Sequence, residues 1–374
     1  MVEQKKILVI THPVSNSGII PISNLIEILL KLSVSIILIS GNKGFDFFRN
    51  DKRYITYGIN SYEIQKNQVK RICQYIKLQI KYSYILIKNY NNFNTLLMFF
   101  GGGTLLLPIL ISKILQKKVI IILPGELLDR TNCIDPLTFI ITTIASLNFF
   151  IADRIIIYST NLIQKLNLEP YSNKIIIAHR HFLDVKNFTL TTPHSERPNL
   201  IGYIGRLSPE KGIKCFIQAL PIIFTKNHDL HVFIGGDGEM KEFIEKSLEN
   251  ENIIHDVTLS GWISHDDLPK YLNQLRLLVL PSYTEGLPNI MLEAMACGTP
   301  VLATPVGAIP DVIRDGETGF IMEDNSPECI ARNVMRALND PDLEQVAKRG
   351  RMFVEGEYTF EKVVERWKGI LTKI

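Results

Sequence analysis

Cysteine is scarce in this chain of 374 residues and shows no spacing typical of a metal site or a disulfide framework. The five cysteines are an odd number and include no CxxC pair. Structural zinc sites need closely spaced Cys or His ligands, and no such spacing occurs. We therefore expect reduced thiols, no bound metal, and a compartment in which disulfides are rare.

Long apolar runs are also missing. The first run, Ile7 to Ile10, is only as long as a strand, so we expect no signal peptide. The longest run, Leu137 to Ile151, is shorter than the ~20 residues that a membrane-spanning helix needs. It fits a buried core helix, with an interfacial membrane contact as the alternative. We expect a cytoplasmic protein, either unattached or peripheral on the inner face of the membrane.

Charge is distributed unevenly along the chain. Residues 1–195 carry 22 Lys and Arg against 11 Asp and Glu, net +11, whereas the remainder carries 19 against 27, net −8. A basic half favours contact with an anionic membrane surface or a phosphorylated acceptor. Solvated surface lysines are an equally simple explanation. No nucleic-acid recognition motif accompanies the charge, so we expect no nucleic-acid partner.

Short apolar segments alternate with helical patterns such as Pro21–Leu32 and Ile64–Lys81. Continuous runs of Ile, Val and Leu are typical of parallel strands covered on both faces. The alternation predicts an α/β fold with doubly wound parallel sheets. The expected strands lie near Lys6–Thr11, Val34–Ile39, Tyr84–Lys88, Val119–Leu123, Arg154–Ser159, Leu200–Ile204, Leu230–Gly235, Val257–Ser260, Leu277–Pro281 and Val301–Thr304.

The stretch Thr189–Pro198 separates the two halves. It is polar, contains two prolines and marks the change in charge, so it is predicted to be a linker. We expect an N-terminal domain over residues 1–190 and a C-terminal domain over residues 191–357. Two Rossmann-like sheets that face each other leave a cleft at their C-terminal strand ends, where ligands of open α/β sheets collect.

The most informative motif is PSYTEGLPNIMLEAMACGTPV, residues Pro281–Val301. A strand is expected to end at Pro281, and Pro288 and Gly298 fit the first turn and the C-terminal stop of a helix. The N-terminus of that helix presents backbone N–H groups and a partial positive charge, which suit a diphosphate. Gly286, just ahead of it, lets the backbone approach a ligand closely.

Two glutamates belong to the same motif. Glu285 precedes the helix and can accept hydrogen bonds from sugar hydroxyls, whereas Glu293 lies within it and can accept from ribose. A solvated helix charge is the simpler explanation for either glutamate alone. The pair in this glycine-containing context favours a ligand site.

The second motif is GRLSPEKG, residues Gly205–Gly212. It follows a predicted strand and is expected to open a helix at Ser208–Pro209, an N-cap followed by proline. Arg206 and Lys211 flank that start, so both can converge on one anion. Two cations there would stabilise a departing nucleoside diphosphate without a metal. An ordinary helix cap with two surface bases is the alternative.

Two further stretches follow strands. GGDGE, Gly235–Glu239, indicates a tight turn, which needs no further role to explain it. In SGWI, Ser260–Ile263, the backbone could line a nucleobase pocket, and packing is the alternative role for Trp262.

In this order the four stretches resemble the family 4 glycosyltransferases, which have the GT-B fold. The match runs from about Gly205 to Gly319, and EGLPNIMLEAMACGTPV is its most specific part. The resemblance implies a retaining transferase that uses a nucleotide-activated sugar and needs no metal or other cofactor. It also implies that the aromatic-apolar segment Tyr358–Ile374 is a last helix that returns to the first domain.

The resemblance assigns roles within the second half. It implies that Arg206 and Lys211 bind the diphosphate, that Glu285 contacts the donor sugar and that Glu293 contacts the ribose. With Arg206, Lys211 and Glu285 as the predicted catalytic residues, the predicted donor-binding set is Gly18, Gly205, Gly236, Trp262, Ile263, Glu285, Gly286, Leu287, Pro288, Asn289 and Glu293.

The first half resembles the family more loosely. Gly18 is the candidate for a loop glycine near the diphosphate or acceptor, where many members have a glycine pair. Where many members place a histidine, this chain has LPGELLDR, with Gly125 and Glu126, so no catalytic histidine carries over. His179 and His181 either are structural or approach the cleft. FGGGTLLLPIL, Phe100–Leu110, suggests a glycine turn that feeds a buried helix and shapes an acceptor groove.

These features together predict transfer of a sugar from a nucleotide-sugar donor to an acceptor hydroxyl with retention of configuration. The expected acceptor is a saccharide, a lipid-linked sugar or a polysaccharide precursor. One alternative is a donor-binding subunit without activity of its own in a membrane polysaccharide complex. Another is a GT-B nucleotide-sugar epimerase or a sugar phosphorylase.

Overall fold

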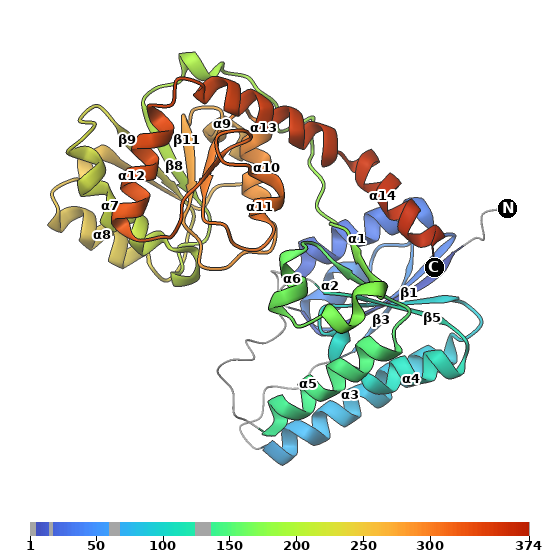
Figure 1. Ribbon diagram of the computed structural model, residues 1–374. Coiled ribbons are helices and arrows are strands. Elements are labelled where there is room, and N and C mark those ends of the chain that lie inside the picture. The colour runs from blue at the N-terminus through green and yellow to red at the C-terminus, as the bar shows by residue number, and fades with distance from the viewer. Residues whose placement is uncertain (1–4, 15–17, 60–67, 124–135, 374) are drawn as a thin grey trace. The chain divides into compact units, whose positions relative to one another are not determined.

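The computed structural model describes residues 5–14, 18–59, 68–123 and 136–373, and it divides the chain into two compact units. Unit 1 comprises Met1–His181 together with Val363–Ile374, and unit 2 comprises Phe182–Lys362 (Figure 1). Each unit is built around one parallel β-sheet. The predicted α/β class is therefore confirmed.

The sheet of unit 1 has seven parallel strands in the order β3-β2-β1-β4-β5-β6-β7. The central strand β1 pairs on both sides, with Leu8 opposite Ile37 of β2 and Leu96 of β4. The strands are β1 Lys6–Thr11, β2 Ser35–Ser40, β3 Ile55–Gly58, β4 Thr95–Phe99, β5 Lys118–Ile122, β6 Arg154–Ile157 and β7 Ile175–Ile177.

Helices cover both faces of this sheet. Right-handed crossovers place α1 and α2 on one face and α3, α4 and α5 on the other, and the latter three lie side by side (Figure 1). The helices are α1 Ile19–Leu32, α2 Lys43–Phe48, α3 Gln68–Lys88, α4 Leu106–Ile114, α5 Pro136–Ile151 and α6 Asn161–Lys165, with α14 Phe360–Thr372 at the end of the chain.

The sheet of unit 2 has six parallel strands in the order β10-β9-β8-β11-β12-β13. They are β8 Leu200–Ile204, β9 His231–Gly235, β10 Val257–Gly261, β11 Leu277–Leu280, β12 Val301–Ala303 and β13 Phe320–Ile321. The helices are α7 Ile213–Phe224, α8 Lys241–Asn250, α9 Leu268–Leu272, α10 Asn289–Ala296, α11 Ile309–Val312, α12 Pro327–Leu338 and α13 Leu343–Glu357.

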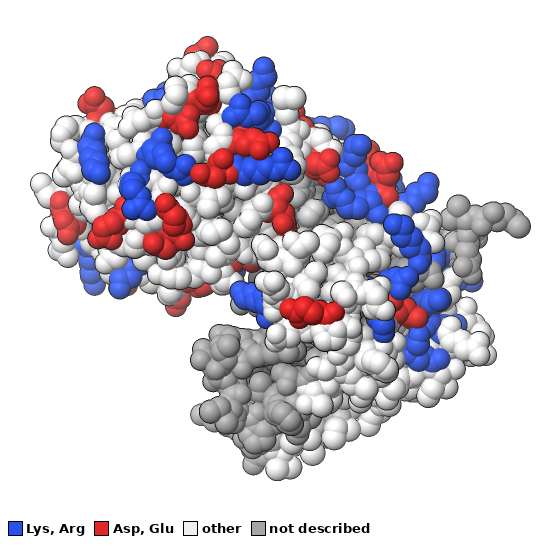
Figure 2. Space-filling model, in the orientation of Figure 1, with Lys and Arg blue, Asp and Glu red and all other residues white. Residues whose placement is uncertain are grey.

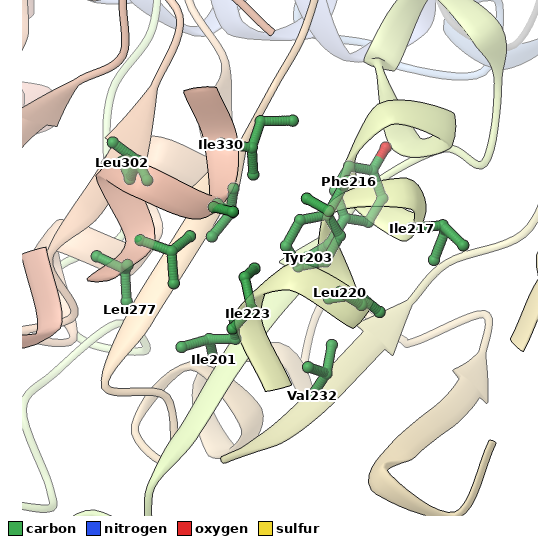
Figure 3. Close-up of a cluster of buried hydrophobic side chains, with 14 of the residues drawn as sticks. Ile201, Tyr203, Phe216, Ile217, Leu220, Ile223, Val232, Leu277, Leu302 and Ile330 are labelled. Atoms are coloured by element: carbon green, nitrogen blue, oxygen red, sulfur yellow. The ribbon is translucent and has the colours of Figure 1, made fainter. Parts of the chain in front are cut away.

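A continuous apolar core holds the strands and helices of unit 2 together. Phe216, Leu220 and Ile223 of α7 pack with Ile201 of β8 and Val232 of β9, and all five side chains are fully buried (Figure 3). Burying a side chain of this size stabilises the fold by about 1.5–3 kcal/mol. The strands are apolar along their length because helices cover them.

The strand expected near Tyr84–Lys88 is wrong, because these residues form the last turns of α3. In this segment Tyr82 and Leu86 are buried, whereas Tyr84 and Ile87 are exposed. Burial that recurs every three to four residues belongs to a helix, and the apolar run concealed it. Strands β3, β4, β7 and β13 were not anticipated.

The apolar run Leu137–Ile151 forms α5, but the prediction of a buried core helix is wrong for its C-terminal part. There Leu147 is 44% exposed and Phe150 is 69% exposed. Among the described residues, no helix has the length and apolar character needed to cross a membrane. The stretch that contains Gly125, Glu126 and Cys133 lies outside the described residues.

Candidate functional site

Glycines hold the loops after β8 and β9 against each other. The N–H of Gly205 donates to the carbonyl of Gly235 at 2.9 Å. Gly236 has a φ of +134°, and a Cβ atom there would lie 1.8 Å from the carbonyl oxygen of Gly205. The GGDGE motif therefore forms the expected tight turn, since only glycine allows this backbone conformation and this close approach.

A second glycine brings the loop after β8 onto the end of β11. Gly212 has a φ of +68°, and a Cβ atom would lie 1.9 Å from the carbonyl oxygen of Pro281. The α-helix expected from Ser208–Pro209 is wrong in detail. Residues Pro209–Lys211 form a single 3₁₀ turn, and α7 begins only at Ile213, after the left-handed Gly212.

This turn places the ammonium group of Lys211 on the carboxylate of Glu285. Lys211 Nζ lies 2.8 Å from Oε1 and 2.9 Å from Oε2 of Glu285, and the hydroxyl of Ser282 donates to Oε1 at 2.8 Å. The side chain of Glu285 is only 9% exposed. A solvated helix charge is therefore excluded for Glu285, and the buried carboxylate depends on its cation.

Arg206 lies on the same loop but does not reach either glutamate of the motif. Its side chain is 61% exposed, and Nη1 lies 3.7 Å from Oε1 of Glu210. The backbone is held in place, because the hydroxyl of Tyr203 donates to the carbonyl of Arg206 at 2.7 Å. A surface ion pair of this kind contributes little, so the guanidinium can turn towards an anionic ligand at small cost.

The start of α10 lacks a side-chain cap. Pro288 is the N-cap residue and its side chain caps nothing. The N–H of Met291 donates to the carbonyl of Pro288 at 3.2 Å, so the N–H groups of Asn289 and Ile290 are those that the first turn offers to an anion. The loop just before α10 is held by a backbone hydrogen bond, in which the N–H of Ala308 donates to the carbonyl of Gly286 at 2.8 Å.

Gly307 packs against the loop that carries Glu285 and Gly286. Its role was not predicted from the sequence. It has a φ of +61°, and a Cβ atom there would lie 2.2 Å from the carbonyl oxygen of Glu285. Its position in a glycine-proline stretch directly after the strand Val301–Thr304 is the signal that could have identified it.

Glu293 of α10 is 8% exposed, which excludes a solvated helix charge for it as well. Its Oε1 lies 3.2 Å from Nε2 of His265, and this hydrogen bond raises the pKa of His265. The ring of His265 also contacts Phe188 edge-on, with 5.1 Å between the ring centroids. His265 was not anticipated. It follows the SGWI motif but belongs to no recognisable motif itself.

A pocket of about 180 Å³ lies between α8 and the ends of β9 and β10. Gly236, Ser260 and Gly261 form part of its lining. Trp262 is 75% exposed, so the alternative packing role for this residue is wrong. Ile263 does pack, since a Cβ atom at Gly235 would lie 2.4 Å from its Cδ1.

Most of the predicted site residues lie together on the strand-end loops of unit 2, and one does not. Gly18 belongs to unit 1, where it is buried at the N-cap of α1. A Cβ atom at Gly18 would lie 2.7 Å from Cβ of Val14, so local packing already explains this glycine. Within the described ranges, no three His, Cys, Asp or Glu side chains are grouped as metal ligands would be.

Comparison with known families identifies the part of the chain that carries these loops. Residues 187–352 match the family described as glycosyl transferases group 1. The chain contains a group 1 glycosyl transferase domain. This domain includes every candidate residue of unit 2, from Gly205 to Glu293.

Two relatives illustrate the extent of the sequence match. The chain is 30% identical over 180 residues to an alpha-D-kanosaminyltransferase of Streptomyces kanamyceticus, covering 48% of this chain and 46% of that protein. It is 31% identical over 183 residues to a lipopolysaccharide 1,2-N-acetylglucosaminetransferase of Salmonella typhimurium, covering 46% of this chain and 48% of that protein. The chain therefore spans about half the length of the relatives it matches.

Solved structures extend the likeness to both units at the level of the fold. HepE of Anabaena, in complex with UDP, superposes with a TM-score of 0.80 at 15% identity, covering 99% of this chain and all of that one. The lipopolysaccharide outer core galactosyltransferase WaaB superposes with a TM-score of 0.76 at 18% identity, covering 98% and 99%. The chain with its group 1 domain has the GT-B fold, as predicted.

Proposed function

We propose that this protein is a retaining, metal-independent glycosyltransferase that moves a sugar from a nucleotide-sugar donor to an acceptor hydroxyl. The observation that carries the proposal is the Lys211–Glu285 ion pair, with a carboxylate only 9% exposed, close to the start of α10, which has no side-chain cap. An ion pair fixed beside a helix start that has no side-chain cap sets a cation where an anionic ligand can bind.

We propose a separate binding position for each part of the donor. The diphosphate would bind the first-turn N–H groups of α10 between Lys211 and Arg206, because a helix N-terminus and two cations favour a pyrophosphate. Glu293 would accept hydrogen bonds from the ribose, and the pocket beside Gly236 would hold the base. HepE binds UDP, so we propose a uridine diphosphate sugar as the first donor to test.

Negative charge develops on the diphosphate as it departs, and stabilising that charge would speed the reaction. Arg206 and Lys211 would stabilise that charge, while Glu285 would hold the donor sugar through its hydroxyls. The departing diphosphate would itself take the proton of the acceptor hydroxyl. The new glycosidic bond then forms on the face that the diphosphate leaves, which retains the configuration.

The decisive experiment incubates the purified full chain with nucleotide sugars, with and without saccharide or lipid-linked acceptors, in the presence of a chelator. We expect acceptor-dependent release of the nucleoside diphosphate that Arg206→Ala slows by about 10²–10³. Donor binding without turnover would instead identify a donor-binding subunit. A changed donor without an acceptor would identify an epimerase, and near-normal turnover of Arg206→Ala would contradict the proposed site.

We also propose that unit 1 contacts an anionic membrane surface through α3. Six apolar side chains of this helix, each 38–68% exposed, recur every three or four residues and so form one stripe. They are Val69, Ile72, Ile76, Ile80, Tyr84 and Ile87. In Figure 2 the part of unit 1 where Figure 1 draws α3, α4 and α5 shows few charged side chains on the visible face.

Positive charge accompanies the apolar stripe. Lys70, Lys77, Lys81 and Lys88 lie along α3 about a quarter-turn from the stripe, and the helix contains no Asp or Glu. The neighbouring helices add exposed Ile114 from α4 and Phe150 from α5. An apolar stripe beside a row of lysines suits the interface of a bilayer that contains anionic lipid.

Sedimentation with lipid vesicles tests this contact on the full chain. We expect binding to vesicles with anionic lipid, weaker binding at high salt, and little binding to purely zwitterionic vesicles. The double substitution Ile76→Ser and Ile80→Ser should weaken binding at least about tenfold, since each removes exposed apolar surface from the interface. Met352→Ser, at a 63% exposed residue of unit 2, is the control. Equal loss in both variants would refute the α3 contact.

A further inference from the structure

Arg180 is a buried arginine whose guanidinium makes no hydrogen bond to the residues that the structure describes. The residue lies three positions after β7 and is 8% exposed, with Cζ 5.0 Å from the ring centroid of Phe99, the last residue of β4. Its Nε is fully buried and has no partner. No carboxylate of the described residues pairs with it, and burial lowers the pKa of Arg180 to about 10. Within the described ranges, this buried cation therefore has no counter-ion.

Arg197 in unit 2 shows how this chain satisfies a buried arginine that has only a structural role. It is 5% exposed, and its guanidinium donates to four backbone carbonyls and one side-chain hydroxyl. The Nη2 bond to the carbonyl of Cys297 is 2.6 Å, and the Nη1 bond to Oγ1 of Thr299 is 2.7 Å. The contrast indicates that Arg180 is not held for structure in the same way.

His181 lies beside Arg180 and has the same deficiency. It is 9% exposed, and no residue in the described part of the chain makes a hydrogen bond to its Nδ1. Burial, followed by the charge of Arg180, lowers the pKa of His181 well below its usual value. A neutral imidazole can donate one N–H to an anion without adding a second buried charge. The two side chains therefore offer complementary donors.

The location of these donors is also that of a ligand site. All strands of this sheet are parallel, so the segments after β4 and β7 emerge at the same carboxyl edge. Ligands of open parallel sheets bind at that edge. We propose that Arg180 and His181 bind an oxyanion, a phosphate or a carboxylate, at the carboxyl edge of the first sheet.

A planar guanidinium matches the two oxygens of either group, and the bond is charge-assisted. The assignment of this anion to the acceptor substrate rests on the proposed transferase function, whereas the binding of an oxyanion does not. A phosphorylated or carboxylated acceptor would then be held through its charge in unit 1.

Trp367 provides a local reporter for the test. It is 1% exposed and its Nε1 donates to the carbonyl of His179 at 2.8 Å, one residue before Arg180. The chain has two tryptophans, so the full chain with Trp262→Phe leaves Trp367 as its single tryptophan. Its fluorescence is titrated with inorganic phosphate and separately with acetate, at constant ionic strength set with chloride.

We expect a saturable response to phosphate, to acetate or to both, and the stronger ligand identifies the chemistry. Arg180→Met should weaken binding by at least about tenfold, and Arg180→Lys by less, because lysine keeps the charge but not the fork. Without the anion, Arg180→Met should melt no lower than its parent, since no hydrogen bond is lost. If Arg180→Met does not fold, Arg180→Lys decides by its weakened response.

A response that is unchanged in the Arg180 variants, or no response to either anion, overturns the site. Arg180 would instead be structural if two results were found together: Arg180→Met melts at a lower temperature than the parent in anion-free buffer, and Arg180→Lys binds the anion as the parent does. Arg206→Ala should slow transfer by about 10²–10³ yet keep the Trp367 response. The parent protein could show an Arg180-dependent Trp367 response but no transfer activity with any donor. In that case the oxyanion site stands and the proposed transferase function fails.

Discussion

His265 and Glu293 form a hydrogen bond between a loop and a buried helix position, with Nε2 3.2 Å from Oε1. The side chain of Glu293 is 11% exposed and that of His265 is 63% exposed. The pair thus connects solvent pH to the carboxylate that we propose for the ribose. Because the hydrogen bond to Glu293 raises the pKa of His265, the imidazolium form is favoured in the folded state.

Replacing the charge of His265 should matter only at low pH. The folded state binds the proton more tightly than the unfolded chain, so the stabilisation is complete below the unfolded pKa of about 6.5 and is lost as pH rises through the higher folded pKa. We expect His265→Gln to reduce unfolding free energy by about 0.5 kcal/mol at pH 5.5, since the pair is partly exposed. At pH 8.5 the two proteins should be alike in urea unfolding, and an equal difference at both values would contradict a charge effect.

Removal of Lys211 should destabilise unit 2 as well as stop transfer. Lys211→Met leaves the buried carboxylate of Glu285 with the Ser282 hydroxyl but no cation, which we expect to cost about 3 kcal/mol. The double variant Lys211→Met with Glu285→Gln should recover most of that stability and remain inactive. Chemical unfolding and a transfer assay measure the two effects, and a double variant no more stable than Lys211→Met would count against the pairing.

Gly212 and Gly261 make a matched pair of glycines for testing the loop after β8. Both have left-handed backbones, with φ of +68° and +70°, but only Gly212 would place a Cβ atom against Pro281. Gly212→Ala should therefore cost several kcal/mol and displace Lys211, whereas Gly261→Ala should cost only about 1 kcal/mol of backbone strain. Similar losses in urea unfolding would show that the close approach to Pro281 is unimportant.

His12 should make unit 1 sensitive to acid. Burial lowers the pKa of His12 to about 4, and its Nε2 lies 3.2 Å from Oγ1 of Thr104. Between about pH 6.5 and pH 4 the unfolded chain binds a proton that the folded state excludes, so stability falls by up to about 1.4 kcal/mol per pH unit. His12→Gln should flatten this decline. The exposed His231→Gln is the control, and the same slope in all three proteins would refute the assignment.

The fold could be predicted from the sequence wherever an apolar pattern fits only one type of secondary structure. Strands Lys6–Thr11 and Leu200–Ile204 match their predicted bounds, because short apolar runs between turn residues fit a covered parallel strand. The segment Tyr84–Lys88 did not, since a run of mixed apolar residues suits a helix face equally well. Only the packing of Tyr82 and Leu86 against unit 1 distinguishes the two.

The sequence alone determined which chemistry unit 2 can offer, because Arg206, Lys211, Glu285 and Glu293 sit in motifs whose spacing is local. Only the tertiary structure decided how these groups are paired. Lys211 meets Glu285 across 74 residues of chain, and His265 meets Glu293 across 28. Burial likewise depends on what packs around a residue, so the buried, unpaired Nε of Arg180 among the described residues and the exposed stripe of α3 emerge only in the folded chain.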